Sequence, residues 1–144
     1  MPDIRHSISI DASPERIHPL TASGAGFSKW WAADTTENPS TGVVDLGFFN
    51  RSTLYRVQPV RIAAPLEAEW LCQTGKEWAG TKLSFKLTQK DGPTLLQFAH
   101  AGWHSDTDYF VSCNTTWGEL MFRLKAAAEG KNPGPLYSAA GMAY

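Results

Sequence analysis

The feature that most constrains the fold is a change of hydrophobic periodicity near residue 105. Before it, apolar and polar residues alternate in several segments, as in residues 66–72 (LEAEWLC) and 82–88 (KLSFKLT). Such alternation predicts strands with one buried face. From residue 106 to residue 130 the spacing becomes three and four, which predicts one amphipathic helix about six turns long. Its apolar stripe consists of Phe110, Cys113, Trp117, Leu120, Met121, Leu124 and Ala127.

Two short helices are expected between the first strand and the rest of the sheet. Residues 4–10 alternate as a half-buried strand. Ser13 is suited to cap a helix that has Pro14 at its first position, and Pro19 keeps this helix short or bends it. Residues 23–31 (SGAGFSKWW) predict a second short helical turn, which places several aromatic side chains on one face.

The middle strands are bounded by turn-forming residues. Residues 34–42 (DTTENPSTG) have the composition of a turn. Residues 43–50 and 52–62 predict two strands, and Pro59 indicates that the second is an edge strand or carries a bulge. Residues 90–92 (KDG) predict a hairpin turn before the last strand. The chain therefore supplies its strands before its long helix.

This order of elements indicates the α+β class. We expect a curved antiparallel sheet of about six to seven strands that grips the long C-terminal helix. One domain is expected over residues 1–144, with a core from about residue 3 to about residue 130. The Pro/Gly-rich tail, residues 131–144, is expected to be ordered only in part. Because one helix does not fill a curved sheet, we also expect an internal cavity.

Charge and composition exclude several classes of partner. The formal net charge is −1 and no cluster of Lys and Arg is present, which argues against nucleic-acid and anionic-membrane binding. No apolar run approaches the roughly 20 residues that a membrane helix needs. Cys72 and Cys113 come without a secretory signal, so we expect two free, buried thiols and a cytoplasmic protein.

Three segments resemble a known group of proteins. They are residues 8–17 (ISIDASPERI) with the later KWW, residues 80–103 (GTKLSFKLTQKDGPTLLQFAHAGW) and residues 114–130 (NTTWGELMFRLKAAAEG). The chain resembles START-like, helix-grip proteins of the SRPBCC superfamily. It is most similar to bacterial heat-shock-protein-90 ATPase-activator homologues, over roughly residues 3–130.

The resemblance implies an antiparallel sheet that grips the C-terminal helix, with an apolar cavity between them. It implies function only broadly. Related folds act as carriers of lipids or other hydrophobic ligands, as polyketide cyclases, as hormone receptors and as co-chaperone modules. Because a fold does not fix a function, the site has to be argued from its residues.

The most polar candidate site is residues 100–110 (HAGWHSDTDYF). A metal ion needs three or four convergent ligands, whereas His100 and His104 are roughly 13 Å apart along an extended strand, too far for one ion unless the chain bends at Gly102. Asp106 and Asp108 are better explained as carboxylates at the start of the long helix. We therefore expect no metal. No Ser–His–Asp set, Gly-rich phosphate loop or Cys-pair zinc motif is present, and we expect no cofactor.

His100 is the one weak catalytic candidate. Strand alternation places it on the cavity side, where it could act as a general acid or base or bind a ligand carbonyl. The alternative is a neutral buried histidine whose hydrogen bonds are satisfied by neighbours. Arg56 is a further candidate, since an arginine that faces the cavity would bind a carboxylate. The alternation around Arg56 leaves its direction open.

An aromatic set on inward faces predicts either a ligand pocket or an ordinary core. Both interpretations stay open at this point. Phe48 and Tyr55 come from the middle strands, and Phe110 and Trp117 come from the long helix. The expected ligand-binding residues are Trp31, Phe48, Tyr55, Trp70, Phe98, His100, Phe110, Cys113 and Trp117.

Three functions are compatible with these features. The first is a small binding protein that holds a hydrophobic or aromatic small molecule between sheet and helix. The second is an enzyme of the cyclase or hydratase type that uses His100 as acid or base. The third is an interaction protein with a homodimer or chaperone partner. The third predicts an exposed apolar patch around Trp78 and Trp103, which strand alternation points outward. These two side chains could equally pack under the Pro-rich tail or across a homodimer.

Overall fold

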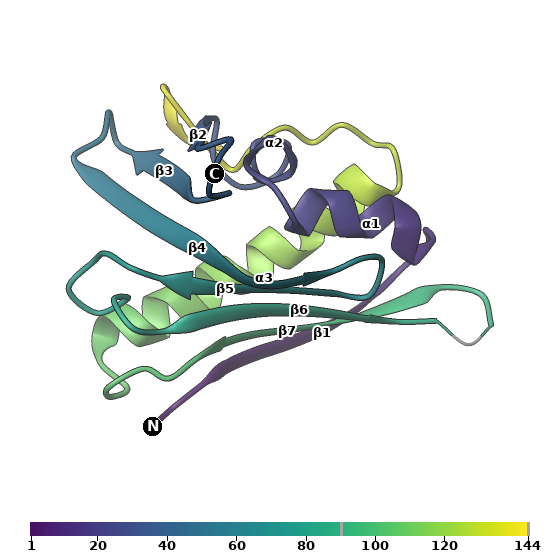
Figure 1. Ribbon diagram of the computed structural model, residues 1–144, viewed down its shortest axis with the longest axis horizontal. Coiled ribbons are helices and arrows are strands. Elements are labelled where there is room, and N and C mark those ends of the chain that lie inside the picture. Colours follow the sequence, from purple (N-terminus) through teal and green to yellow (C-terminus); the bar gives the residue numbers. More distant parts are fainter. Residues whose placement is uncertain (90, 144) are drawn as a thin grey trace.

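The computed structural model describes residues 1–89 and 91–143. Its main element is a seven-stranded antiparallel sheet with the strand order β1-β7-β6-β5-β4-β3-β2 (Figure 1). The long helix α3 (Asp108–Ala128) lies across one face of this sheet, and the short helices α1 (Pro14–Thr21) and α2 (Gly24–Phe27) lie beside it. The strands are β1 (Ile4–Ile10), β2 (Asp34–Glu37), β3 (Val44–Phe48), β4 (Thr53–Ala63), β5 (Glu67–Cys72), β6 (Lys82–Thr88) and β7 (Thr94–Ala101). The predicted α+β, helix-grip architecture is confirmed.

Strand register decides which side chains face α3. In the pairing of β6 with β7, Leu83 lies opposite His100 and Phe85 lies opposite Phe98. Alternation along each strand buries all four of these side chains, while their neighbours on the other face are more exposed. His100 therefore belongs to the inner layer of the molecule, next to the helix.

Helix α3 begins and ends where its local chemistry predicts. The Thr107 hydroxyl accepts a hydrogen bond from the backbone N–H of Phe110, which is the contact of an N-cap residue. After the helix, Gly130 has a positive φ of 83°, a conformation that glycine adopts without strain. The buried face carries Cys113, Trp117, Leu120, Met121, Leu124 and Ala128. This stripe fixes which side of α3 meets the sheet.

Two local expectations for the strands are corrected or refined. Residues 34–42 do not form only a turn, because their first part is the edge strand β2, which pairs with β3. The backbone pairing outweighs the low strand propensity of a polar sequence at an exposed edge. Pro59 does mark a bulge in β4, between Pro59 and Arg61, and this strand lies inside the sheet. The hairpin turn predicted at residues 90–92 includes residue 90, which lies outside the described residues.

The C-terminal tail packs against the body of the protein, which differs from the expected partial order. Leu136 is completely buried, and its backbone N–H donates to the Trp30 carbonyl oxygen at 3.1 Å. The Arg123 guanidinium donates to the carbonyl oxygens of Pro133 at 2.7 Å and Gly134 at 3.0 Å. These contacts hold the tail across the helices, where it ends in the small hairpin of β8 (Tyr137–Ser138) and β9 (Gly141–Met142) (Figure 1).

Within the described part of the chain, no helix is both long enough and apolar enough to span a membrane.

Candidate functional site

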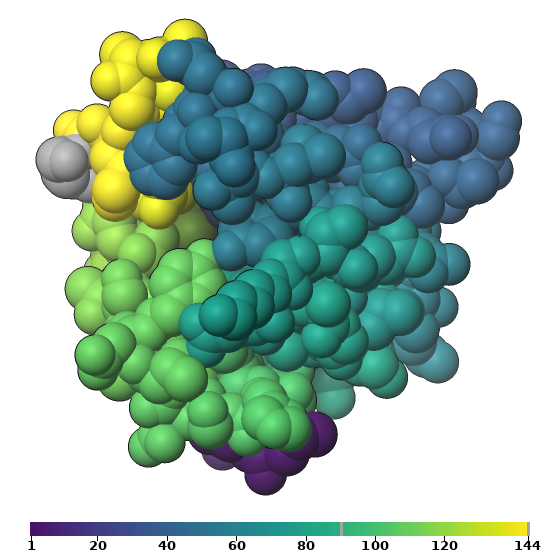
Figure 2. Space-filling model, turned by 90° about the vertical axis from the view of Figure 1, so that its left-hand side faces the viewer, coloured from purple at the N-terminus to yellow at the C-terminus, as the bar shows by residue number. Residues whose placement is uncertain are grey.

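A pocket of about 550 Å³ lies between the first half of α3, the strands β3 and β4, and the tail. Figure 2 shows this end of the molecule, where the tail (yellow) meets the β3–β4 region (blue) above α3 (green). The walls are mostly aromatic, and polar side chains lie at the rim and at a few inner positions. The aromatic lining residues are Trp31, Phe48, Phe49, Tyr55, Trp78, Tyr109, Trp117 and Tyr137.

Aromatic stacking makes one wall of the pocket rigid. The rings of Tyr55 and Trp78 are stacked with centroids 4.0 Å apart and an interplanar angle of 8°. Trp78 also lies 6.2 Å from Trp117, and Trp117 lies 4.9 Å from Trp31. Each ring restricts its neighbour, so the wall presents flat apolar surfaces in fixed orientations. Such surfaces suit a planar apolar ligand.

The polar groups inside the pocket are neutral. The hydroxyls of Tyr55 and Tyr109 are hydrogen-bonded to each other. Burial raises the pKa of both tyrosines and that of the Cys113 thiol. At neutral pH all three therefore keep their protons. The charged lining residues, Lys76 and Glu77, come from the loop at the rim, where Glu77 accepts a hydrogen bond from the Thr107 hydroxyl.

Trp78 carries a polar atom without a partner. Its side chain is only 5% exposed, and its indole Nε1–H is buried and has no hydrogen-bond acceptor among the described residues. The Cys113 thiol lies beside this N–H, which lowers the pKa of the thiol against the larger rise that burial causes, but the contact lacks the geometry of a hydrogen bond. The pocket wall thus contains an unsatisfied donor.

The predicted ligand-binding residues separate into two groups. Trp31, Phe48, Tyr55, Cys113 and Trp117 line the pocket. The remaining four lie elsewhere in the layer between sheet and helix. Trp70 packs against Phe27 at 5.1 Å, Phe98 lies between Phe85 and Trp117, and Phe110 contacts the Trp103 ring. These residues form core, because neighbouring side chains surround them.

His100 has both ring nitrogens engaged by protein groups. Its Nδ1 accepts a hydrogen bond from Trp117 Nε1 at 3.1 Å, which assigns the proton to Nε2. This Nε2–H lies 2.8 Å from the Thr81 hydroxyl oxygen, and that hydroxyl donates to the Trp78 carbonyl oxygen. Burial lowers the pKa of His100 to about 3. The ring is therefore neutral, with no free nitrogen to offer a substrate.

The exposed patch expected around Trp78 and Trp103 is wrong. Trp78 is not in a strand but in the connection between β5 and β6, which folds its ring onto Tyr55. Trp103 is completely buried. Gly102, with a positive φ of 84°, reverses the chain before Trp103 and brings its ring against His100, with centroids 4.7 Å apart. Both residues lie outside the strands, so the alternation of side chains along a strand does not decide where they point.

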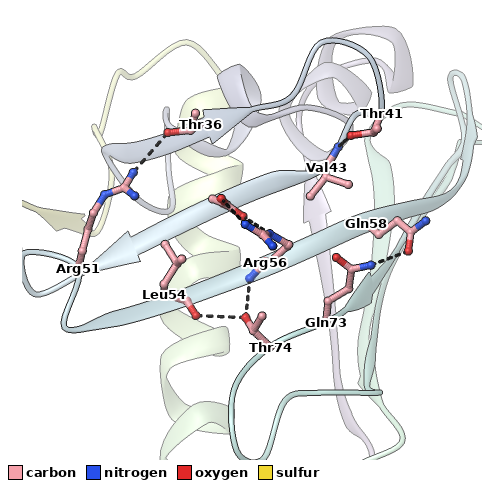
Figure 3. Close-up of polar contacts among 10 residues, drawn as sticks. Thr36, Thr41, Val43, Arg51, Leu54, Arg56, Gln58, Gln73 and Thr74 are labelled. Atoms are coloured by element: carbon pink, nitrogen blue, oxygen red, sulfur yellow. Dashed lines mark hydrogen bonds and ion pairs between the residues drawn. The ribbon is translucent and has the colours of Figure 1, made fainter.

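Arg56 does not face the cavity. Its guanidinium pairs with Asp45 through two nitrogens, at 2.7 and 3.1 Å, on the outer face of β3 and β4. The pairing lowers the pKa of the Asp45 carboxyl through the hydrogen bond from Arg56. Figure 3 shows Arg56 on this polar surface, close to Thr74 and to the hydrogen-bonded side chains of Gln58 and Gln73. The carboxylate-binding role considered for Arg56 is therefore not supported.

Several lining residues were not predicted from the sequence. Trp78 lies in a loop, and Tyr137 and Met142 belong to the tail, where no hydrophobic periodicity signals burial. Thr116 is on α3 beside the buried stripe, so helical spacing could have placed it at the edge of the cavity, and the same spacing does predict Tyr109 at the start of the inner face of this helix. Among the described residues, no three His, Cys, Asp or Glu side chains group as metal ligands would.

The fold is the START-like, helix-grip fold. The structure is similar to that of the Aha1 dimer from Colwellia psychrerythraea, with a TM-score of 0.78 and 28% sequence identity over 91% of this chain and 98% of that chain. This similarity confirms the resemblance to the heat-shock-protein-90 ATPase-activator homologues.

More distant structures share the fold alone. CalU16 from Micromonospora echinospora has a TM-score of 0.70 and 14% identity, over 92% of this chain and 77% of that chain. DynU16, a protein of the dynemicin biosynthetic locus, has a TM-score of 0.75 and 12% identity, over 94% of this chain and 50% of that chain. No protein-family model matches the sequence, and neither does any curated protein.

Proposed function

We propose that this protein binds a hydrophobic or aromatic small molecule in the pocket between the sheet and α3. The observation that carries the proposal is a cavity of about 550 Å³ whose walls are aromatic and whose inner polar groups are neutral. Its volume falls within the range of small-molecule sites. Stacked rings such as Tyr55 and Trp78 offer flat apolar surfaces without a conformational change.

A fluorescent probe tests this proposal. N-phenyl-1-naphthylamine becomes bright in apolar surroundings, and we expect it to bind the wild-type protein with saturation. Thr116→Phe fills the pocket from α3 and should reduce probe affinity on the order of tenfold. Thr115→Phe is the matched control, because Thr115 is the adjacent exposed threonine and does not line the pocket. No saturable binding, or an equal loss in both variants, would contradict the proposal.

The arrangement around His100 does not favour a cyclase or hydratase that acts through this residue. A general acid or base needs a nitrogen that can reach the substrate. Both nitrogens of His100 are engaged by Trp117 and Thr81, and His100 is not part of the pocket lining. We therefore assign His100 a structural role, in which it holds Trp117 in the pocket wall.

We propose self-association as a second function. It is supported by the 28% identity to a protein whose structure is that of a dimer. It is also supported by two apolar side chains on the outer surface of α3, Val111 and Phe122, which are 56% and 64% exposed. A second copy of this chain would cover them. Light scattering should give the mass of a dimer, and Phe122→Glu should give a monomer. A wild-type monomer at high concentration would contradict this function.

A further inference from the structure

The tryptophans of this protein differ in how their indole N–H groups are satisfied. Trp30 donates to the Leu20 carbonyl oxygen at 2.8 Å, and Trp70 donates to the Thr21 carbonyl oxygen at 2.9 Å. Trp78 Nε1–H has no acceptor among the described residues. Buried donors in native proteins are nearly always paired, and an unpaired one often marks a missing partner. Because Trp78 is part of the pocket wall, a ligand can supply that partner.

The surroundings of this N–H contain more donors than good acceptors. Tyr55 and Tyr109 share one hydrogen bond between two hydroxyl groups, so one O–H proton remains for another acceptor. The group beside both Tyr109 and Trp78 is the Cys113 thiol, whose sulfur is a weak acceptor. The corner thus offers an indole N–H and a phenolic O–H to whatever occupies the pocket.

Charge indicates what kind of acceptor fits. The inner groups of this corner are neutral, and the lining cation Lys76 is an exposed residue at the rim. A carboxylate at the corner would lose its hydration without gaining a cation, which is costly. A carbonyl oxygen loses less hydration and can accept two hydrogen bonds. The corner therefore suits an uncharged acceptor oxygen.

We propose that the pocket selects aromatic ligands that carry a carbonyl oxygen, such as aryl ketones or quinones, and that Trp78 Nε1–H donates to this oxygen. The proposal rests on the proposed binding function. Trp78 has two roles here, since its ring stacks on Tyr55 as part of the wall and its N–H recognises the oxygen. The ligand oxygen takes the place of the Cys113 thiol beside the N–H.

Two probes of nearly the same shape test the proposal. 2-Acetylnaphthalene carries a carbonyl oxygen, and 2-ethylnaphthalene does not. Each is titrated against protein-bound N-phenyl-1-naphthylamine, and the ratio of the two dissociation constants is compared between variants. Trp78→Phe keeps an aromatic ring but removes the N–H. We therefore expect the affinity for the ketone to fall on the order of tenfold relative to the affinity for the hydrocarbon.

Trp103→Phe is the matched control. Trp103 Nε1–H is also buried and unpaired, but Trp103 does not line the pocket. This variant should keep the wild-type ratio. A second variant, Cys113→Ser, leaves Trp78 intact and gives its N–H a stronger acceptor within the protein. The affinity for the ketone relative to the hydrocarbon should therefore fall in this variant too.

The outcomes separate this inference from the proposed function. If both probes bind and neither Trp78→Phe nor Cys113→Ser changes the ratio, carbonyl recognition is overturned while the pocket remains a binding site. If Trp103→Phe lowers the ratio as much as Trp78→Phe does, the effect comes from the core and the inference is also overturned. If the fluorescent probe binds with saturation but neither naphthalene displaces it, the inference is overturned while the proposed function stands. If the fluorescent probe itself does not bind with saturation, both fail.

Discussion

The layer between the sheet and α3 has two ends that are built from similar residues but packed differently. At one end, α1 and α2 close the layer, and the rings of Phe27, Trp30 and Trp70 contact one another or their neighbours directly. At the other end the tail closes the layer only in part, and the rings of Trp78 and Trp117 border a pocket.

The two ends also differ in hydrogen bonding. The indole N–H groups of Trp30 and Trp70 donate to backbone carbonyls of α1, whereas Trp78 has no acceptor among the described residues. Tryptophan alone therefore does not mark a site, since it occurs at both ends. The combination of an unfilled volume with an unsatisfied donor is what distinguishes a ligand pocket from a core.

Two phenylalanine truncations should show the difference in packing most strongly. Phe85→Ala removes a ring that is surrounded on all sides, so we expect the free energy of unfolding to fall by about 3–5 kcal/mol. Phe48→Ala removes a ring that already borders the pocket, and we expect a smaller loss of about 1–2 kcal/mol. Urea unfolding measures both. Equal losses would mean that the pocket end is packed as tightly as the core.

His100 should make stability depend on pH. The pKa of His100 in the folded protein is about 3, below the ordinary value near 6.5. Below pH 6.5 the unfolded chain therefore binds a proton on this residue, whereas the folded protein does not. This contribution to stability is present above pH 6.5 and is lost as the pH falls toward 3. From pH 7 to pH 4.5 the free energy of unfolding should drop by roughly 2–3 kcal/mol through this residue.

His100→Gln isolates this contribution. A glutamine can accept from Trp117 and donate to Thr81, but it does not titrate. Denaturant unfolding at the two pH values should therefore show a smaller decrease in the variant than in the wild type. The same decrease in both proteins would show that other groups cause the acid sensitivity and that His100 is not held neutral by the fold.

The smallest effect is expected from loosening the tail. Arg123→Ala removes donors to the carbonyl oxygens of Pro133 and Gly134, so Tyr137 and Met142 are held less firmly in the pocket wall. We expect the affinity for N-phenyl-1-naphthylamine to fall by about threefold. Arg56→Ala is the control, because that arginine pairs with Asp45 on the outer face. Equal affinities in the two variants would show that the contacts of Arg123 with the tail do not contribute to ligand binding.

The fold could be predicted from the sequence because both of its periodic patterns depend on burial of one face. The alternation around Phe85 and Phe98 and the helical stripe that contains Trp117 each survive in the structure. Edge strand β2 could not be predicted, since its polar residues are held by backbone pairing with β3 and not by side-chain burial. Burial of Leu136 in the tail likewise follows from tertiary contacts that no local pattern records.

Most of the candidate site that could be predicted coincides with a regular element, and Trp31, which follows α2, is the exception. Phe48, Tyr55 and Cys113 follow from strand and helix periodicity. Strand alternation predicts exposed side chains for Trp78 and Trp103, but both residues lie beyond the ends of the strands. There a loop and Gly102, which has a positive φ, change the direction of the chain. Which aromatic residues line the pocket and which belong to the core depends on the spaces that side chains leave unfilled. These spaces depend on the packing of all elements together.

The most direct measurement follows the indole N–H resonances by NMR while 2-acetylnaphthalene is added to the labelled protein. Single Trp→Phe variants assign the peaks. We expect the Trp78 resonance to move most, because its N–H gains an acceptor, while the resonances of Trp30 and Trp70 stay in place because their carbonyl partners do not change. A Trp78 resonance that does not move when the probe binds, or a shift confined to Trp30 and Trp70, would show that Trp78 does not bind the carbonyl oxygen.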